Sequence, residues 1–313
     1  MKRALGYVSS GLAFAILVGV LLGYGGAFLF ELDLLAHFRL HLLLLIPPVA
    51  VLAFAGQQWT ALLRLGTAAL FALAGLAPAW APSHVGSENG TQLVVLTANL
   101  SYDNPRPDLV RAALLAEDAD ILVTNETTKA MQSGVTSLAR HYPFRLMLST
   151  SRTVLRTVVW SKYPMREGRL LLEADVEPTG AMAIVTLPDG FEVLVLGLHM
   201  GQNAGGKQQT HIEALGSLLE DRPHPRIVLG DFNATPWSWA LQRVESLTRT
   251  ARVPGYFVTW RGDYPTPLGN VPAILGQAID HILVSPSIGI QEVSVVDVPG
   301  SDHMGIRAVL RIP

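Results

Sequence analysis

Hydrophobic residues are concentrated at the start of the chain, before position 91. Three uncharged and largely apolar stretches of 27, 24 and 23 residues lie there; Glu31, Asp33 and Arg39 separate the first two, and Arg64 separates the last two. Because a helix needs about 20 apolar residues to cross a bilayer, each stretch is long enough to span a membrane. The pattern predicts three transmembrane helices, near Leu5–Phe30, Leu40–Gly56 and Leu62–Trp80.

The second span is the shortest of the three, and we expect Pro47 and Pro48 to kink it. One alternative is that this span is re-entrant. A cleaved signal peptide is another, but a signal peptide's apolar region has only about 7–15 residues and is not followed by two more spans. Three spans therefore remain the preferred interpretation.

Charged residues at the ends of the spans indicate the orientation. Lys2, Arg3 and Arg64 fall on one side of the predicted membrane. A single basic residue, Arg39, falls on the other side together with two acidic ones. Since basic residues favour the cytoplasmic side, we expect a cytoplasmic amino terminus and, after three crossings, an outward-facing carboxyl-terminal part. A re-entrant second span would reverse that placement.

The rest of the chain has the charge density of a soluble domain. From position 91 onward, 223 residues carry 19 Lys or Arg and 22 Asp or Glu, a net charge of −3. This length suits one large α/β domain. We therefore divide the chain into a membrane anchor (1–82), a linker (83–91) and a globular domain (92–313). Because the chain has no cysteine, thiolate catalysis, cysteine-ligated metals and disulfides are excluded.

Short apolar runs and helical patterns alternate through the globular part. The expected strands are Leu93–Leu100, Ile121–Thr124, Phe144–Leu148, Val158–Ser161, Arg169–Ala174, Met182–Leu187, Val193–Leu198, Ile227–Leu229, Ile279–Val284, Val293–Val296 and Ile306–Ile312. The expected helices are Asp108–Glu117, Thr128–Arg140, Lys207–Leu219 and Ser238–Val244. This order predicts an α/β fold, a four-layer sandwich of two packed, mostly antiparallel sheets flanked by helices, which three transmembrane helices precede.

Six of the apolar runs end in polar side chains. These are Asn99, Glu126, His199, Asp231 with Asn233, Asp280 with His281, and Asp302 with His303. Taken singly, each is most often a turn former or a packed surface residue. Ligands gather outside the carboxyl ends of strands in sheets of this kind, so six together predict one shared cleft.

In this order, the polar residues resemble those of the endonuclease/exonuclease/phosphatase (DNase I-like) superfamily. The most specific pieces are Gly230-Asp231-Phe232-Asn233 and Ser301-Asp302-His303. With its amino-terminal spans, the chain is similar to the membrane-anchored bacterial branch that includes teicoplanin-resistance membrane proteins. The resemblance implies a multi-pass protein of the bacterial cytoplasmic (inner) membrane, with its catalytic domain facing the periplasm or the exterior.

The resemblance also implies an Mg²⁺-dependent (or Mn²⁺-dependent) phosphohydrolase or phosphodiesterase. Glu126 is expected to bind the cation, with Asn99 supplying a neutral oxygen and Asp302 supporting the same ion or a second one. Mg²⁺ prefers one or two carboxylates plus water and substrate oxygens, which suits this set.

A second set is expected to act on the reacting groups. His303 is the candidate general base because a neutral imidazole near pH 7 suits proton abstraction, and by resemblance Asp280 orients it. Asp231 and Asn233 are expected to orient the nucleophile and hold the phosphate. His199 is expected to hydrogen-bond the phosphoryl group or protonate the leaving oxygen.

Three further side chains have a structural interpretation. His281 is expected to pack rather than react. Trp237 and Trp239 form either an apolar wall near the cleft or ordinary helix packing.

A tethered, outward-facing site favours a phosphorylated, lipid-linked substrate at the bilayer surface. The domain charge of −3 argues against a strong nucleic-acid surface, which needs many Lys and Arg. Two alternatives remain, an extracytoplasmic nuclease and a non-catalytic envelope binding protein. The complete set of polar residues argues against the second.

Overall fold

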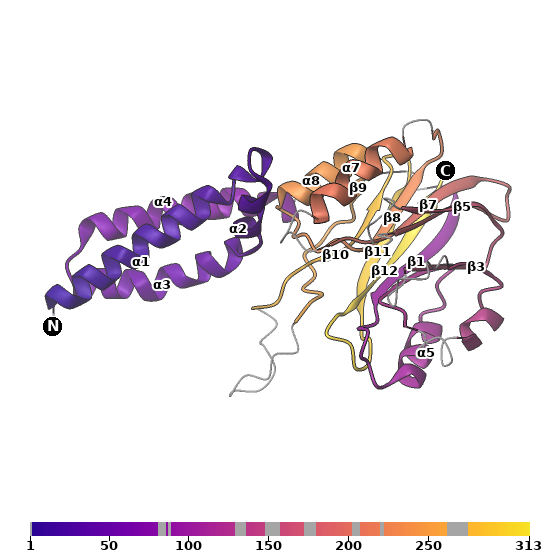
Figure 1. Cartoon of the computed structure of the whole chain (residues 1–313), viewed down its shortest axis with the longest axis horizontal. Helices are drawn as coiled ribbons and strands as arrows, with labels where there is room; N and C mark the ends of the chain where they lie inside the picture. The colour runs from indigo at the N-terminus through magenta and orange to yellow at the C-terminus, as the bar shows by residue number, and fades with distance from the viewer. Residues whose placement is uncertain are drawn as a thin grey trace.

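The computed structural model describes residues 2–80, 86, 89–128, 136–147, 157–171, 180–201, 207–219, 222–261 and 275–313. Figure 1 shows two parts, a bundle of long helices and a sandwich of sheets. The amino terminus lies at the far end of the bundle, and the carboxyl terminus lies at the far end of the sandwich.

Three long helices form the anchor and pack against one another: α1 (Lys2–Leu22), α3 (Arg39–Ala55) and α4 (Trp59–Leu76). Their inner sides carry small or branched side chains three or four positions apart, such as Ala13, Ile16 and Val20 of α1. Their outer sides are apolar too, with Leu63 73% exposed. Helices that are apolar all round belong in lipid or in a large core, so the bundle is suited to a membrane.

Two of these helices, Lys2–Leu22 and Trp59–Trp80, are long and apolar enough to cross a membrane. The first ends earlier than expected from the sequence, at Leu22 instead of Phe30, because the glycine-rich segment after it forms short 3-10 turns, η1 (Gly25–Ala27) and η2 (Phe30–Leu32).

The third candidate span is a bent pair, Phe30–His37 with Arg39–Ala55, whose axes meet at 54°. The short α2 (Asp33–His37) forms most of the first arm. α3 runs on as one helix through Pro47 and Pro48, so this bend lies at Phe38 and not at the prolines.

Two six-stranded sheets form the sandwich. The first has the order β11-β12-β1-β2-β4-β3, and the second has the order β5-β6-β7-β8-β10-β9. The strands are β1 (Thr91–Asn99), β2 (Ile121–Asn125), β3 (Phe144–Leu146), β4 (Val158–Ser161), β5 (Met165–Leu171), β6 (Gly180–Thr186), β7 (Glu192–His199), β8 (Arg226–Asp231), β9 (Ala251–Arg252), β10 (Asp280–Val284), β11 (Gly289–Val296) and β12 (Gly305–Ile312). In the described part, β1–β2 and β7–β8 are parallel pairs and the other pairs are antiparallel.

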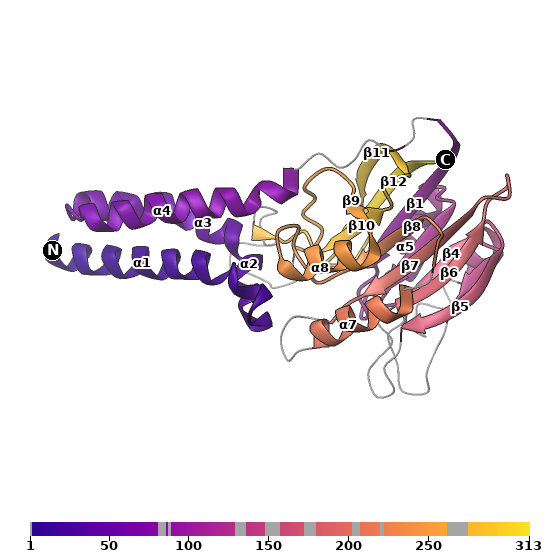
Figure 2. The same ribbon diagram turned by 90° about the horizontal axis from the view of Figure 1, so that it is seen from above.

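Helices cover the outer face of each sheet. α5 (Pro107–Ala116) packs Val110 and Leu114 on the first sheet. α7 (Lys207–Leu219) and α8 (Trp239–Thr248) pack on the second, as Figure 2 shows. A third apolar cluster fills the space between the sheets. The four-layer α/β sandwich expected from the sequence is thus confirmed.

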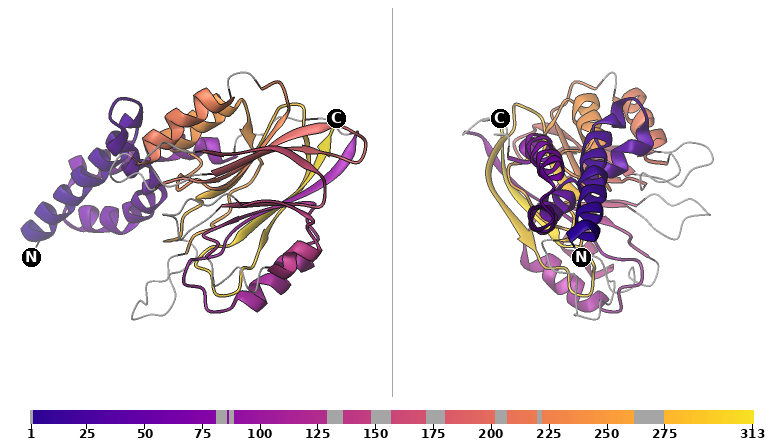
Figure 3. Two further views of the ribbon diagram at one scale, coloured as in Figure 1. Left: turned by 45° about the vertical axis from the view of Figure 1, so that its right-hand side comes forward. Right: turned by 90° about the vertical axis from the view of Figure 1, so that its left-hand side faces the viewer.

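The direction of the strands decides which end of the sandwich faces the anchor. β1 begins at Thr91, which pairs with Ile312 beside the carboxyl terminus. That terminus lies away from the helical bundle in Figure 1 and in the left view of Figure 3. β1 and its parallel neighbour β2 therefore run toward the anchor. At the carboxyl end of β1, Asn99 contacts Asp231, which lies four positions before Thr235, and Thr235 binds His37 of the anchor.

Candidate active site

Strand pairing gathers the predicted side chains at one edge of the sandwich. In the second sheet, His199 at the end of β7 pairs with Asp231 at the end of β8. Asp231 also pairs with Asp280, because β10 is antiparallel to β8 and begins where β8 ends. Glu126 directly follows β2 of the first sheet, and it has a φ of 55°, a left-handed conformation that turns the chain sharply.

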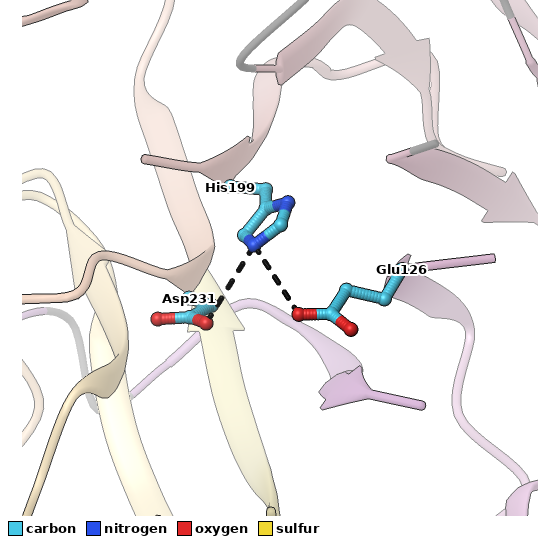
Figure 4. A group of neighbouring side chains, drawn as sticks. All are labelled: Glu126, His199 and Asp231. Atoms are coloured by element: carbon cyan, nitrogen blue, oxygen red, sulfur yellow. Dashed lines mark ion pairs between the residues drawn. The ribbon is translucent and has the colours of Figure 1, made fainter. Parts of the chain in front are cut away.

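Glu126, His199 and Asp231 form the first group of the site, which Figure 4 shows pointing toward one another. The Nε2 atom of His199 lies 3.6 Å from Oε1 of Glu126 and 3.8 Å from Oδ2 of Asp231. Their ligand atoms all lie within 4.8 Å of one another. Because Glu126 comes from one sheet and the other two from the second sheet, this group joins the two sheets.

Asn99 connects the two carboxylates of this group. Its Nδ2 donates to Oε1 of Glu126 and to Oδ2 of Asp231, both at 3.1 Å. Its Oδ1 accepts the Ser101 amide at 3.0 Å, which fixes the orientation of the carboxamide. The other Glu126 oxygen accepts the amide of Tyr102 at 2.9 Å. The first group is therefore held by hydrogen bonds that reach from β1 to β8.

Asp231, Asp280 and His303 form the second group. The Nδ1–H of His303 donates to Oδ2 of Asp280 at 2.8 Å, and its Nε2 lies 4.0 Å from Oδ2 of Asp231. The backbone amide of Asp280 donates to Thr259 Oγ1 at 3.1 Å, which helps to hold the carboxylate in place. Asp231 belongs to both groups, so the two are continuous.

Burial and charge shift two pKa values in this site. Burial, together with the nearby Asp280 carboxylate, raises the pKa of Asp231 to about 6. Burial alone would lower the pKa of His303, but the Asp280 and Asp231 carboxylates outweigh it and raise that pKa to about 10. The site is thus rich in negative charge and stabilises a positive charge placed within it.

The residues present fit a divalent cation. Carboxylate oxygens are the preferred ligands of Mg²⁺ and Mn²⁺, and an imidazole nitrogen is at hand. In the described part of the chain, the ion-pair partners of Glu126 and Asp231 are histidines, and no lysine or arginine neutralises them. The first group is therefore the place where this chain would hold a metal ion.

Two predicted residues make contacts outside these groups. Asn233, at a φ of 48°, donates its amide N–H to Oδ1 of Asp231 at 2.8 Å and its Nδ2–H to the Met200 carbonyl at 2.7 Å. Asp302 accepts the indole N–H of Trp260 at 2.9 Å. Among the described residues, Asp302 belongs to neither carboxylate–histidine group. Phosphate binding by Asn233 and metal binding by Asp302 stay predictions.

Other residues support the site in ways that strand periodicity does not signal. Asn125 stands inside the domain between the two sheets, where its Nδ2 donates to the Leu198 carbonyl at 2.9 Å and its Oδ1 accepts the Asp231 amide at 3.2 Å. Gln208 of α7 donates to the carbonyls of Phe232 and Asn233, both at 2.9 Å. In the sequence, the role of Asn125 is signalled only by its position directly before Glu126, a predicted metal ligand.

The three residues with a structural interpretation are packed rather than directed into the site. His281 is buried, and its Nε2–H donates to the Ala234 carbonyl at 2.7 Å. Burial lowers the pKa of His281 to about 3, so the ring is neutral. Trp237 and Trp239 pack against the anchor instead of lining the cleft.

The sequence profile of the Endonuclease/Exonuclease/phosphatase family matches residues 96–303. The chain belongs to this family. The match runs from within β1 to His303 and so covers both groups of the site. Members of the family are typically metal-dependent phosphoester hydrolases, and the convergence of Glu126, Asp231 and His303 is what that chemistry requires.

Two curated proteins are similar to part of this chain. A UPF0294 protein of Vibrio vulnificus (strain YJ016) is 26% identical over 162 residues, which are 50% of this chain and 54% of that protein. The chain thus spans about half the length of the curated relatives it matches.

Two solved structures of the family illustrate the shared fold. D. rerio TDP2 in complex with a single-strand DNA product has a TM-score of 0.57 at 15% identity, covering 71% of this chain and 99% of that chain. Sphingomyelinase C from Streptomyces griseocarneus has a TM-score of 0.51 at 17% identity, covering 70% and 99%. These similarities establish the architecture.

Proposed function

We propose that this protein is a membrane-anchored, divalent-metal-dependent phosphoester hydrolase that acts on a lipid-linked phosphate or pyrophosphate at the outer face of the bacterial cytoplasmic membrane. The proposal places it with the branch that includes teicoplanin-resistance membrane proteins. Its partners would be the lipid bilayer and a phosphorylated substrate. Mg²⁺ is the proposed cation, with Mn²⁺ as a substitute.

One observation carries the lipid substrate: the edge that holds the site is the edge nearer the anchor. The carboxyl ends of β1 and β2 point toward the bundle, and the segment after Asn233 contacts the loop between α1 and α3. A substrate whose phosphate lies at the headgroup level of a bilayer would meet this edge. A site for a soluble substrate such as nucleic acid would not have to lie near the membrane.

The side chains divide the reaction between them. When bound, the divalent cation would neutralise charge on the phosphoryl oxygens and the leaving group, held by Glu126 and Asp231. A cation held by Glu126 and Asp231 would offset the carboxylate charge that raises the pKa of His303 and would so favour the neutral ring. Nε2 of the neutral ring would then take a proton from the attacking water, while Asp280 holds its Nδ1–H and stabilises the imidazolium. Water attacks phosphorus and the ester bond breaks. His199 donates a hydrogen bond to the phosphoryl group or a proton to the leaving oxygen.

Two alternatives differ from this in what the site would do. A nuclease would use the same residues on nucleic acid, and the family includes a DNA-bound structure, but the domain charge of −3 disfavours a strong nucleic-acid surface. A non-catalytic binding protein would not need the hydrogen bond between His303 and Asp280, which orients a base.

A substrate comparison tests the proposal. The purified full-length protein in nanodiscs is incubated with Mg²⁺ or Mn²⁺ and with polyprenyl pyrophosphate, sphingomyelin or single-stranded DNA. We expect phosphate or headgroup release from a lipid substrate that stops with a chelator. Release of nucleotides alone would reject the lipid substrate, and no turnover of any phosphoester would reject the enzyme.

The base is tested with a matched pair of histidine variants. His303→Ala is expected to lower kcat by about 10²-fold or more, since general bases typically contribute 10²- to 10⁴-fold. His141→Ala removes a partly exposed imidazole that pairs with Asp118 outside the site, and it should leave kcat unchanged. Equal rates for the two variants would remove His303 as the base.

A further inference from the structure

The loop between α1 and α3 binds the segment that follows the catalytic Asp231-Phe232-Asn233 motif. Asp33 of this loop is completely buried, and its carboxylate accepts the backbone amides of Trp239 at 2.7 Å and Ala240 at 3.0 Å. These are the first two residues of α8, whose own N-cap, Ser238, accepts the Leu241 amide at 3.2 Å. The anchor therefore completes the N-terminal capping of a helix in the domain.

Further contacts extend this attachment back toward the site. The backbone amide of Thr235 donates to Nδ1 of His37 at 3.2 Å, and the indole N–H of Trp237 donates to the Ala36 carbonyl at 2.7 Å. Residues 235–240 of the domain are thus held by residues 33–37 of the anchor.

Arg39 ties this junction to the ends of the anchor helices. Its guanidinium donates to the carbonyls of Gly23 at 3.2 Å, Gly75 at 2.9 Å and Trp237 at 3.5 Å, and it lies 4.3 Å from the centre of the Tyr24 ring. These bonds join α1, α4 and the domain through one buried side chain. The loop is consequently a fixed part of the bundle rather than a free connection.

The junction and the site are separated by only a few peptide groups. Asn233 holds Asp231 through its amide, and its left-handed φ of 48° is a conformation that its surroundings must maintain. Gln208 and His281 hold the carbonyls of residues 232–234 from the domain side. The Thr235 amide and the Trp237 indole bind the anchor instead, although the Thr235 carbonyl accepts from Ser238 within the domain. A shift at Thr235 would therefore reach Asn233 and Asp231.

We propose that Asp33 and His37 are positioning residues for the Asp231–Asn233 motif, so that the outer loop of the membrane anchor sets the geometry of the catalytic carboxylate. The inference rests on the proposed hydrolase activity and deepens it: the anchor contributes to turnover as well as to location. The anchor and the domain pack closely at Gly26, because a Cβ there would lie 2.8 Å from Cβ of Asp33 and 3.0 Å from Cβ of Trp239.

The test uses the full-length protein in nanodiscs and a small soluble phosphodiester, bis(p-nitrophenyl) phosphate, with Mn²⁺. Asp33→Ala is expected to lower kcat by about 10-fold or more with KM changed by less than about 2-fold, because small displacements of catalytic groups cost up to about 10²-fold. Asp33→Asn keeps only one of the two acceptor oxygens that bind the Trp239 and Ala240 amides, so its kcat should lie between those of the wild type and Asp33→Ala.

Glu31→Ala is the matched control. It removes an exposed carboxylate from the same loop, two positions from Asp33, and it should leave kcat and KM unchanged. Gly26→Ala should reproduce the kcat loss of Asp33→Ala by crowding the same contact while keeping the carboxylate. Wild-type kcat in both Asp33→Ala and Gly26→Ala would overturn the proposal.

Hydrogen–deuterium exchange separates this proposal from the proposed function. Asp33→Ala should accelerate exchange of the amides of residues 231–240, including those of the catalytic motif, whether or not any phosphoester is turned over. Faster exchange confined to residues 239–240, with residues 231–234 unchanged, would show that the anchor only caps α8 and would overturn the inference. Lack of turnover by the wild-type protein, with the coupled exchange present, would instead reject the hydrolase.

Discussion

Asp231 is the side chain on which both halves of the site depend. Its Oδ2 lies 3.1 Å from Asn99 Nδ2, 3.8 Å from His199 Nε2 and 4.0 Å from His303 Nε2. Its Oδ1 accepts the Asn233 amide. One carboxylate thus connects the metal-binding group to the candidate base, which explains why these residues occupy separate strands and yet act together.

The charge of the His303–Asp280 pair predicts a pH-dependent stability. His303 has a pKa of about 10 in the folded chain, above the usual 6.5, so folding favours its protonated form. This contribution is fully present below about pH 6.5 and is lost as the pH rises through about 10. We therefore expect the melting temperature of the chelator-treated protein to fall from pH 6.5 to 10, measured by tryptophan fluorescence. Asp280→Asn should flatten the curve, and parallel curves would contradict the pairing.

Asp302 offers a second test at this scale. Its carboxylate accepts the Trp260 indole N–H, and an asparagine would keep an acceptor oxygen there. If Asp302 supports the cation, as the resemblance implies, Asp302→Asn should weaken Mn²⁺ binding, measured by electron paramagnetic resonance, and a change in affinity of less than about 3-fold would reject it as a ligand. Glu126→Gln should weaken it by about 10-fold or more, since it removes a ligand charge. An equal loss of Mn²⁺ affinity in both variants would establish Asp302 as a metal ligand.

Polar side chains at the ends of strands predict which residues lie close together, but not which atoms each side chain contacts. Asn99, Glu126, His199, Asp231, Asp280 and His303 all converge as expected, because pairing alone determines where strand ends lie. The partner of Asp302 lies across a loop from it, 42 positions away in sequence, so no local pattern contains it. The attachment of Asp33 to α8 is hidden for the same reason.

At the scale of elements, the end of β8 shows how backbone conformation places Asp231. Gly230 has a φ of 147°, and a Cβ there would lie 1.9 Å from the Leu198 carbonyl oxygen of β7. Only glycine allows the two strands to approach this closely immediately before Asp231.

A pair of glycine substitutions tests this. Gly230→Ala is expected to destabilise the protein by about 2–4 kcal/mol, through backbone strain and the clash. Gly216→Ala adds the same methyl group within α7, where the nearest atom outside the helix, Cδ2 of Leu247, would be 3.5 Å away, and it should stabilise the protein by about 0.5–1 kcal/mol through helix propensity. The melting temperature in detergent should therefore fall in Gly230→Ala and rise in Gly216→Ala. Equal shifts in the two variants would contradict the backbone strain at position 230.

Most element boundaries could be predicted because buried side chains recur every three or four positions in a helix and every two in a strand. Val158–Ser161 and Lys207–Leu219 agree with the expected bounds, whereas residues 172–174 and 129–135 of two expected elements lie outside the described part. The two-residue strand β9 was not expected, since it is too short to show alternation. The early end of α1 depends on how the segment after it turns to meet the domain, which hydropathy does not report.

At the scale of the whole molecule, the anchor places the amino terminus and the domain at opposite ends of the bundle. Because the chain has no cysteine, single cysteines report topology without background. We expect a membrane-impermeant maleimide to label Ser287→Cys in intact cells from which any outer membrane has been removed. It should label Thr60→Cys, at the far end of the bundle, only after lysis.

The same experiment addresses the re-entrant alternative. Labelling of Thr60→Cys before lysis, with Ser287→Cys protected, would place the domain in the cytoplasm and reject the outer face. Labelling of both positions before lysis would reject three crossings.

The contact between Asp33 and Trp239 joins positions 206 residues apart, which has a consequence for biosynthesis. The aspartate leaves the ribosome long before its amide donors have been translated. Until they arrive, an ionised carboxylate destined for the interior remains hydrated at the membrane surface. Docking is therefore a late event in assembly, and chains interrupted before position 240 would leave this acid and the surface around it open to proteases that survey newly inserted proteins.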